Sequence, residues 1–198
     1  IIRSMLSNVE PDLMIVPSTG KTFIPEGEVY DWLYDQDAVE SMSCVLEEQV
    51  FISYDGKQCI AKAKGVDWIY EDITPLKEHI REGEFKLHKG DVPMAAVGAV
   101  LAYDLSLSPR FVAPIEIYYP TRTGKISMAN PMSALEAIKV WPSCTFSVNS
   151  DIDAQLMILP IEKMRELLEY SQEVSAVEIR IKEGTAAKEA AGIKKGLS

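Results

Sequence analysis

The chain has 198 residues, of which 47% are hydrophobic and 25% are charged, a balance typical of a globular protein with a packed core. This length allows one large domain or two small lobes. The formal net charge is −10. That charge argues against nucleic acid and against an anionic lipid surface as partners, because both are bound through clustered Lys and Arg.

No run in the sequence is suited to crossing a membrane. The longest apolar run, residues 94–105, is too short to span a bilayer and includes Gly98 and Asp104. No secretory signal peptide is recognisable. Because the first residue is Ile1 and not Met, we expect the sequence to be part of a longer gene product. The missing span therefore predicts nothing about the parent protein.

The first third of the chain predicts a strand, a helix and a hairpin. Residues 12–16 form an apolar run typical of a short strand. Residues 28–34 are expected to form a short helix. Its apolar face would consist of Val29, Trp32 and Leu33. Residues 45–54 and 57–64 are rich in strand-forming residues, and the Asp55-Gly56 pair between them is typical of a two-residue hairpin turn.

The middle of the chain predicts shorter elements, after a change in composition at Trp68. Thr74-Pro75 combines a good N-cap with a proline in the first turn, and it predicts a helix that ends at Gly83. Gly98 is expected to open a second small helix. The expected strands are 85–87, 94–97, 115–119 and 145–148, and a polar turn is expected at 149–153.

Residues 155–181 predict a strand–helix–strand unit around which the chain is organised. Residues 156–159 form a short apolar run, Pro160 suits the first turn of a helix, and residues 161–168 have amphipathic helical spacing. In the last strand, apolar and charged residues alternate, so Glu178 is expected on a solvent-facing side. The unit holds no reactive residue and is interpreted as a scaffold. A weak helix is expected at 186–197.

Residues 120–142 fit no simple element. Connections of this length are usually functional or disordered. The segment combines positive charge with adaptable apolar side chains, which suits a protein contact. The candidate contact residues are Arg122, Lys125, Met128, Met132 and Trp141. The alternative is a packed excursion whose Met and Trp side chains fill the core, and the residues by themselves leave both interpretations open.

No pattern typical of a catalytic or metal site is present. The two histidines, His79 and His88, are accompanied by no GxSxG motif and are interpreted as surface residues, although a triad assembled in space stays open. The acidic residues form no distinct carboxylate pair and no EF-hand loop. We therefore expect no catalytic residue, no metal and no cofactor.

The three cysteines, Cys44, Cys59 and Cys144, are scattered and have no zinc-site spacing. We interpret them as three buried thiols. A bridge between Cys44 and Cys59 is the alternative, since both lie near what is expected to be one sheet. The sequence leaves their thiol state open.

From residue 94 onward, a series of short motifs resembles a known family. An apolar strand runs into Gly98 and Leu101-Ala102, and an Ile-x-Ile strand ends at Pro120. A strand then leads into an Asp-containing turn, an apolar strand runs into Pro160, and an amphipathic helix precedes Val174-Ser175. This order is similar to that of the extracytoplasmic core domain of FtsX/MacB/LolC-type ABC-transporter permeases. Permeases of the Bacteroidetes kind and lipoprotein-releasing permeases are the members that it resembles.

The resemblance covers most of the chain and rests on residues that determine a fold. It implies an α+β fold with two lobes. Residues 1–67 and 151–198 would form a porter-like lobe, and residues 68–150 an inserted Sabre-like lobe. It also implies transmembrane helices before Ile1 and beyond Ser198. The piece itself would then be soluble and periplasmic, and its parent embedded in the inner membrane.

The resemblance also implies a function. In this family a separate cytoplasmic ATPase hydrolyses ATP, and the periplasmic domain relays movement without chemistry of its own. The implied partners are that ATPase, a second permease subunit of the same or another kind, and a periplasmic carrier or lipoprotein. In lipoprotein-releasing permeases a protruding hairpin engages the carrier. Residues 120–142 occupy the corresponding place, which favours the contact interpretation.

Lipoprotein release is therefore the first functional hypothesis. MacB-type efflux and FtsX-type signalling to cell-wall hydrolases are alternatives within the family. A soluble ligand-binding protein or enzyme that only resembles these domains, and a passive assembly module, are alternatives outside it.

Overall fold

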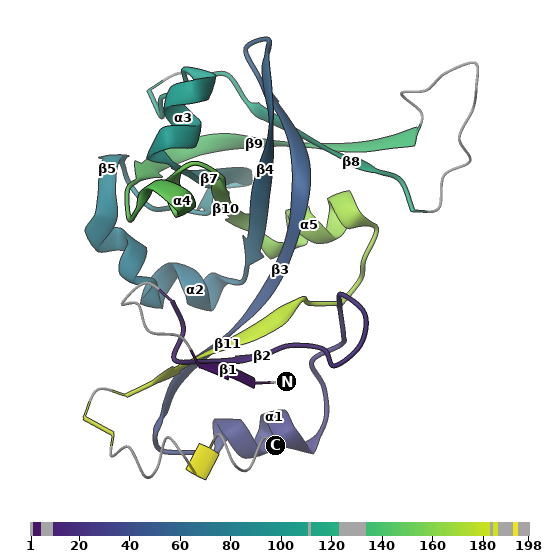
Figure 1. Cartoon of the computed structure of the whole chain (residues 1–198), viewed down its shortest axis with the longest axis vertical. Coiled ribbons are helices and arrows are strands. Elements are labelled where there is room, and N and C mark those ends of the chain that lie inside the picture. Colours follow the sequence, from purple (N-terminus) through teal and green to yellow (C-terminus); the bar gives the residue numbers. More distant parts are fainter. Residues whose placement is uncertain are drawn as a thin grey trace.

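Figure 1 shows the chain as a computed structural model, which describes residues 2–4, 10–110, 112–122, 134–182, 184–185 and 192–193. The predicted α+β class is confirmed. The helices are α1 (Glu28–Tyr34), α2 (Trp68–Ile73), α3 (Ala99–Leu105), α4 (Ser150–Asp153), α5 (Ile161–Leu168) and the 3-10 helix η1 (Pro75–His79). The strands are β1 (Ile2–Ser4), β2 (Leu13–Ile15), β3 (Val39–Tyr54), β4 (Lys57–Val66), β5 (Ile80–Gly83), β6 (His88–Lys89), β7 (Val92–Gly98), β8 (Ile115–Pro120), β9 (Leu135–Phe146), β10 (Leu156–Pro160) and β11 (Ala176–Ile181).

Six strands close into a ring. β3 pairs with β4, β4 with β10, β10 with β7, β7 with β9, β9 with β8, and β8 pairs back with β3. The β4–β10 and β7–β9 pairs are parallel, and the other four are antiparallel. Closure of this kind gives hydrogen-bond partners to backbone N–H and C=O groups that would otherwise be unpaired at a sheet edge. We call these six strands the ring.

One apolar cluster fills the ring. Each of the six strands contributes two alternate, buried side chains, as expected when one face of every strand points inward. They are Val50, Ile52, Ala61, Ala63, Ala95, Val97, Ile115, Ile117, Ile138, Val140, Met157 and Leu159. Buried residues of α3 and α5 join the same cluster. Where α5 meets β4, a Cβ on Gly65 would lie 2.6 Å from Cγ of Met164, so only a glycine fits the observed approach.

A second cluster coats part of the outer face of the ring. Tyr70 of α2, Leu76 of η1 and Phe85 pack there with Phe146 and Ile158, which face away from the ring interior. The coat leaves the outer face of β3 and β8 uncovered near the β3–β4 turn, where Phe51 is 42% exposed.

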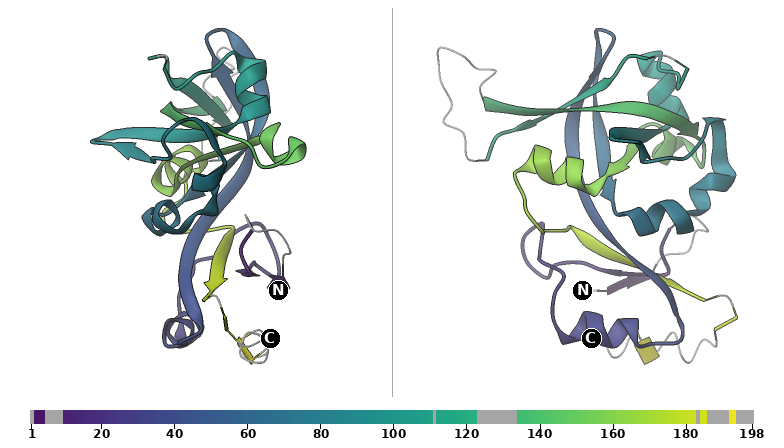
Figure 2. Two further views of the ribbon diagram at one scale, coloured as in Figure 1. Left: turned by 90° about the vertical axis from the view of Figure 1, so that its left-hand side faces the viewer. Right: turned by 180° about the vertical axis from the view of Figure 1, so that it is seen from behind.

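β3 runs on beyond the ring into a second, open sheet. Its first residues pair with β11, β11 pairs with β2, and β2 pairs with β1. Helix α1 covers this part, and its Leu33 is buried together with Leu13 and Met42. Figures 1 and 2 show β1, α1 and residues 192–193 at one end of the molecule and the ring at the other. We call β1, β2, β11 and the first part of β3 the open sheet.

The predicted strand–helix–strand unit is confirmed as β10, α5 and β11. The two strands run parallel but are not neighbours, because β3 and β4 lie between them. The ring takes β3, β4 and β10 from the segments predicted as porter-like, and β7, β8 and β9 from the segment predicted as Sabre-like. The boundaries of the two lobes stay a prediction.

Local signals in the first third of the chain are confirmed. The helix at 28–34 has the predicted bounds, and the Asp55-Gly56 turn joins β3 to β4 with positive φ at both residues, 46° and 79°. A two-residue turn of this kind needs positive φ at both positions. The predicted apolar face of the helix is only partly right: Leu33 is buried, whereas Val29 and Trp32 are exposed.

Other expectations are wrong, and each error has a tertiary cause. Thr74 and Pro75 do start a helix, but it is the short η1, because Ile80–Gly83 instead pairs with β9 as strand β5. Residues 85–87 form no strand, and the N–H of Leu87 donates instead to the carboxylate of Glu71 on α2. The expected turn at 149–153 contains helix α4, because the Asn149 side chain accepts hydrogen bonds from the N–H groups of Asp151 and Ile152.

The long connection is shorter than expected. β9 begins at Leu135, so Trp141 and Pro142 belong to a strand and not to a loop. The helix expected at 186–197 lies outside the described residues except for 192–193. Within the described part of the chain, no helix is both long and apolar enough to cross a membrane.

Candidate functional site

The β8–β9 hairpin projects from the ring. The two strands pair from Ile115 and Val140 out to Pro120 and Leu135, and Figures 1 and 2 show them extending past α5. Of the five predicted contact residues, Lys125, Met128 and Met132 lie outside the described residues. The structure places Arg122 just after β8 and Trp141 within β9.

Arg122 joins the hairpin to the end of α5. Its guanidinium donates to the carbonyl oxygen of Leu168 at 3.3 Å and lies 4.1 Å from the centre of the Tyr170 ring. The backbone N–H of Arg122 and the hydroxyl of Thr121 both donate to the same carboxylate oxygen of Glu169. Glu169 ends α5 in the left-handed conformation, with φ 54°. The cation therefore sits where helix carbonyls lack helical donors and attract positive charge.

Trp141 is half-buried on the outer face of the ring. Its indole N–H donates to the carbonyl oxygen of Val112 at 3.1 Å, so its polar atom is satisfied within the chain. Trp141 and the candidate Arg122 thus lie at different places, one in β9 and one beside α5. Their role as partner contacts stays a prediction.

An exposed apolar row crosses the outer face of the ring over β4, β3, β8 and β9. Ile60, Phe51 and Tyr118 are aligned by strand register, and Ala137 of β9 continues the row. Ile60 is 67% exposed and Phe51 is 42% exposed. This row was not predicted from the sequence, although Phe51 and Ile60 alternate with inward-facing neighbours in the predicted hairpin. What the sequence lacks is the pairing of β3 with β8, which brings Tyr118 beside Phe51.

A charged pair borders the row. Lys139 Nζ lies 2.9 Å from a carboxylate oxygen of Glu116, and the Tyr118 hydroxyl donates to the other oxygen at 2.7 Å. The hydrogen bonds from Lys139 and Tyr118 lower the pKa of Glu116 below its usual range. An apolar row with charged neighbours is a surface composition that suits contact with another protein.

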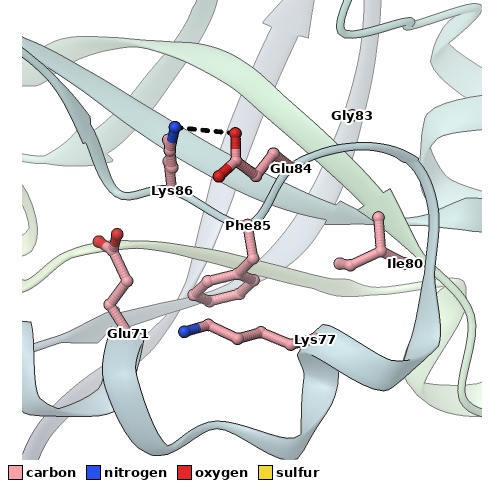
Figure 3. A pocket seen from close by; sticks show the side chains of 7 residues that line it. All are labelled: Glu71, Lys77, Ile80, Gly83, Glu84, Phe85 and Lys86. Carbon is pink, nitrogen blue, oxygen red and sulfur yellow. Dashed lines mark ion pairs between the residues drawn. The ribbon is translucent and has the colours of Figure 1, made fainter.

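An open pocket of about 390 Å³ lies beside β5, between η1 and the segment that follows β5. Figure 3 shows Phe85 at its centre, the Lys77 side chain passing beneath the ring, and the Lys86–Glu84 ion pair at its rim. That ion pair measures 2.8 Å. Glu71 accepts a hydrogen bond from the N–H of Leu87 at 3.0 Å. The lining brings charges of both signs around an aromatic ring but contains no His, Cys or Ser, so it offers no nucleophile–base pair.

A buried ion pair lies where the ring meets the open sheet. Nζ of Lys64 lies 2.6 Å from a carboxylate oxygen of Glu178, and the two side chains are only 10% and 6% exposed. The expectation of a solvent-facing Glu178 is therefore wrong, because α2 covers this face and brings the Tyr70 ring within 4.8 Å of Nζ. Burial disfavours the charged amine, but the Tyr70 phenol and the carboxylates of Glu178 and Glu47 outweigh it and raise the pKa of Lys64 above its ordinary value.

The cysteines are free. A Cys44–Cys59 bridge is excluded, because Cys59 lies opposite Ile52 on β3, eight residues along that strand from Cys44, or roughly 26 Å at the rise of a strand. Cys144 is buried as expected, whereas Cys44 and Cys59 are half-buried. Burial raises the pKa of all three thiols, that of Cys144 to about 11.

The two histidines lie on different elements. His79 ends η1, and His88 of β6 has its Nε2 2.7 Å from a carboxylate oxygen of Glu162 on α5. Among the described residues, no three His, Cys, Asp or Glu side chains are grouped closely enough to hold a metal ion.

Three solved structures share the architecture of this chain. The extracellular domain of the noncanonic ABC-type transporter YknZ from Gram-positive bacteria matches 97% of this chain and 86% of its own, at 13% identity and a TM-score of 0.55. The periplasmic region of MacB from Actinobacillus actinomycetemcomitans matches 89% of this chain and 80% of its own, at 11% identity and a TM-score of 0.53. A domain of a candidate permease from Porphyromonas gingivalis matches with the same coverage, at 14% identity and a TM-score of 0.52.

The chain has the fold of extracytoplasmic ABC-permease domains. The predicted MacB-like architecture is thereby confirmed. No family model matches the chain, and no curated protein does. At identities of 11–14% the likeness concerns the fold, so the Bacteroidetes likeness, the transported substrate and the contact residues stay predictions.

Proposed function

We propose that the chain is the extracytoplasmic domain of an ABC-transporter permease subunit. In this proposal it relays ATP-driven conformational change and uses the β8–β9 hairpin to contact a substrate or a periplasmic partner. Lipoprotein release is the process that we favour. The domain carries out no chemistry of its own, and its parent sits in the inner membrane with this domain in the periplasm.

The observation that carries the proposal is the anchored hairpin. Arg122, Thr121 and Glu169 connect it to α5, and α5 leads through Tyr170 into β11 of the open sheet. A displacement of the open sheet therefore has a packed route to the hairpin, which projects from the ring. Such a route supports a relay between two ends of the molecule.

The placement of the chain ends agrees with the proposal. β1 and residues 192–193 lie at the same end of the molecule, away from the hairpin (Figure 1). A domain held between two membrane helices needs this arrangement. The proposed partners are a cytoplasmic ATPase, a second permease subunit and a periplasmic carrier or lipoprotein. The division into porter-like and Sabre-like lobes belongs to this proposal.

Efflux of the MacB type is the second candidate, because the periplasmic region of MacB is among the structures that share the fold. The two candidates differ in what the hairpin meets. Lipoprotein release predicts a carrier or a lipid-modified protein at the hairpin, so trapping of neither would favour the second candidate.

The test is photocrosslinking in the full-length parent in its native membrane. A photoreactive residue replaces Met128 or Trp141, and trapped material is identified by mass. The control position is Asp31, which is exposed on α1 at the opposite end of the molecule. We expect a periplasmic carrier or a lipoprotein to be trapped from the hairpin and not from position 31. Crosslinks confined to the same chain would contradict the contact role and favour a packed excursion.

A further inference from the structure

The ring and the open sheet share one continuous strand. β3 pairs with β4 from Val45 to Tyr54 and with β11 from Val39 to Val45, so the two parts meet at Val45. A single strand can bend and twist, and strand pairing along β3 fixes register more firmly than it fixes the angle between two sheets. Side chains that bridge β4 and β11 across β3 are therefore placed to set that angle.

Lys64 and Glu178 form such a bridge. Lys64 lies on β4, two residues before the last residue of the strand, and Glu178 lies on β11 opposite Ser43. Their charged atoms meet at 2.6 Å across β3, and both side chains are close to fully buried. The Tyr70 ring of α2 lies beside the ammonium group at 4.8 Å.

A second residue holds that ring in place. Asp67 caps α2 by accepting a hydrogen bond from the N–H of Tyr70, and it also accepts from the hydroxyl of Ser43 at 2.8 Å and from the N–H of Cys44 at 2.7 Å. Its carboxylate thus ties α2 to β3 at the point where β3 leaves the ring. Lys64, Glu178 and Tyr70 are positioned by three different elements and by this cap.

The ion pair is expected to add little net stability. Removing two charges from water costs about as much as their attraction returns, and apolar residues of similar volume often stabilise a buried site equally well. The direction of the ion pair, however, depends on where each charge lies, whereas apolar side chains tolerate small rotations and shifts. The geometry is thus better suited to fixing an orientation than to holding the fold together.

We propose that the Lys64–Glu178 ion pair, packed against Tyr70, fixes the orientation of the open sheet relative to the ring. Lys64 and Glu178 are positioning residues in this role. The proposal stands on the geometry of the junction by itself. Within the proposed function, the same junction passes movement of the open sheet to the ring and to the hairpin that the ring carries.

The test measures that orientation in the 198-residue chain. Spin labels carried on non-natural amino acids replace Gln58, exposed on β4 of the ring, and Asp31, exposed on α1 beside the open sheet, which leaves the native thiols unchanged. A second label pair, Gln58 with Asp91, reports on the ring alone. Electron–electron distance distributions are recorded for the unmodified junction and for the double variant Lys64→Met with Glu178→Leu.

We expect the double variant to stay folded. The distribution of distances between labels 58 and 31 should become broader, while that between labels 58 and 91 should stay as narrow as before. The matched control replaces the exposed pair Lys139 and Glu116 of β9 and β8 with the same residues, Met and Leu, and should change neither distribution. An unchanged Gln58–Asp31 distribution in the folded double variant would overturn the proposal.

If the double variant does not fold, Glu178→Gln is measured instead, since it keeps the size of the side chain and removes its charge. It should broaden the same distribution, and an unchanged width would again overturn the proposal. Because no membrane, ATPase or transported substrate is involved, this outcome is independent of the crosslinking result. A broadened Gln58–Asp31 distribution without a trapped partner would establish the junction and contradict only the contact role of the hairpin.

Discussion

The ring and the open sheet share strand β3 but are held together differently. In the ring, the last strand pairs back with the first, and twelve inward-facing side chains fill the interior. In the open sheet, β1 and β2 have three residues each and β1 is an edge strand. Closure makes the ring rigid from within, so it suits a platform that carries a projecting hairpin.

The open sheet depends on what lies beside it. Its strands are covered by α1 and tied to the ring through β3, Asp67 and the Lys64–Glu178 pair. A part with short strands and few partners is expected to be the one that moves first. We therefore expect the junction, and not either sheet, to set how the two parts respond to each other.

Breaking the junction on one side should have the largest effect. Glu178→Leu leaves the buried Lys64 charge without its partner and is expected to lower the free energy of unfolding by about 3–5 kcal/mol. Chemical denaturation measures this change. Glu116→Leu is the control, because its ion pair is exposed and is expected to contribute less than about 1 kcal/mol. Equal effects of the two variants would contradict the distinction between junction and surface.

The second-largest loss of stability is expected in the ring itself, at Gly98. A Cβ on Gly98 would lie 2.4 Å from the carbonyl oxygen of Asp153, a backbone atom that cannot move aside. Gly98→Ala is therefore expected to cost about 3 kcal/mol, at the upper end of the effect of overpacking. Gly65→Ala is the matched comparison: its Cβ would lie 2.6 Å from Cγ of Met164 but 3.1 Å from the nearest backbone atom, Cα of Ile161, so it should cost less than Gly98→Ala. Thermal unfolding of both variants checks the order.

The free energy of unfolding should depend on pH through Cys144, which lies in the outer cluster of the ring. Burial raises the pKa of this thiol from 9.0 to about 11, so its contribution to stability is fully present below pH 9 and is lost as the pH rises to about 11. The loss should reach about 2–3 kcal/mol. Unfolding free energies are compared between the wild type and Cys144→Ala across this range. The prediction fails if both proteins show the same slope.

The smallest effect is expected at the outer end of the hairpin, where Arg122 follows β8. Arg122→Ala removes an exposed cation from Tyr170 and from the end of α5 and should change stability by less than about 1 kcal/mol. It should nevertheless speed hydrogen exchange at Thr121, since the hairpin loses part of its anchor. Arg122→Lys keeps the charge and should retain part of the protection. Exchange rates identical to those of the wild type would show that Arg122 does not couple the hairpin to α5.

Several elements were predictable because their causes are local. The turn at Asp55-Gly56 depends on two residues that tolerate positive φ, and α5 depends on Pro160 and on spacing within one helix. The resemblance to permease domains rests on the order of such local motifs, and the shared fold agrees with it. The candidate site was predicted less well. Trp141 was expected in a loop but lies in β9, and Lys125, Met128 and Met132 lie outside the described residues.

The amino-acid sequence was enough to predict α1, α5, β10, the turn between β3 and β4, and the α+β class. The folded chain was needed to find that six strands close into a ring, that Tyr118 lies beside Phe51, and that Glu178 is buried against Lys64. The physical reason is the range of the interactions. Backbone conformation and amphipathic spacing are set within a few residues, whereas Lys64 and Glu178 are 114 residues apart and meet only after β3 has paired on both sides.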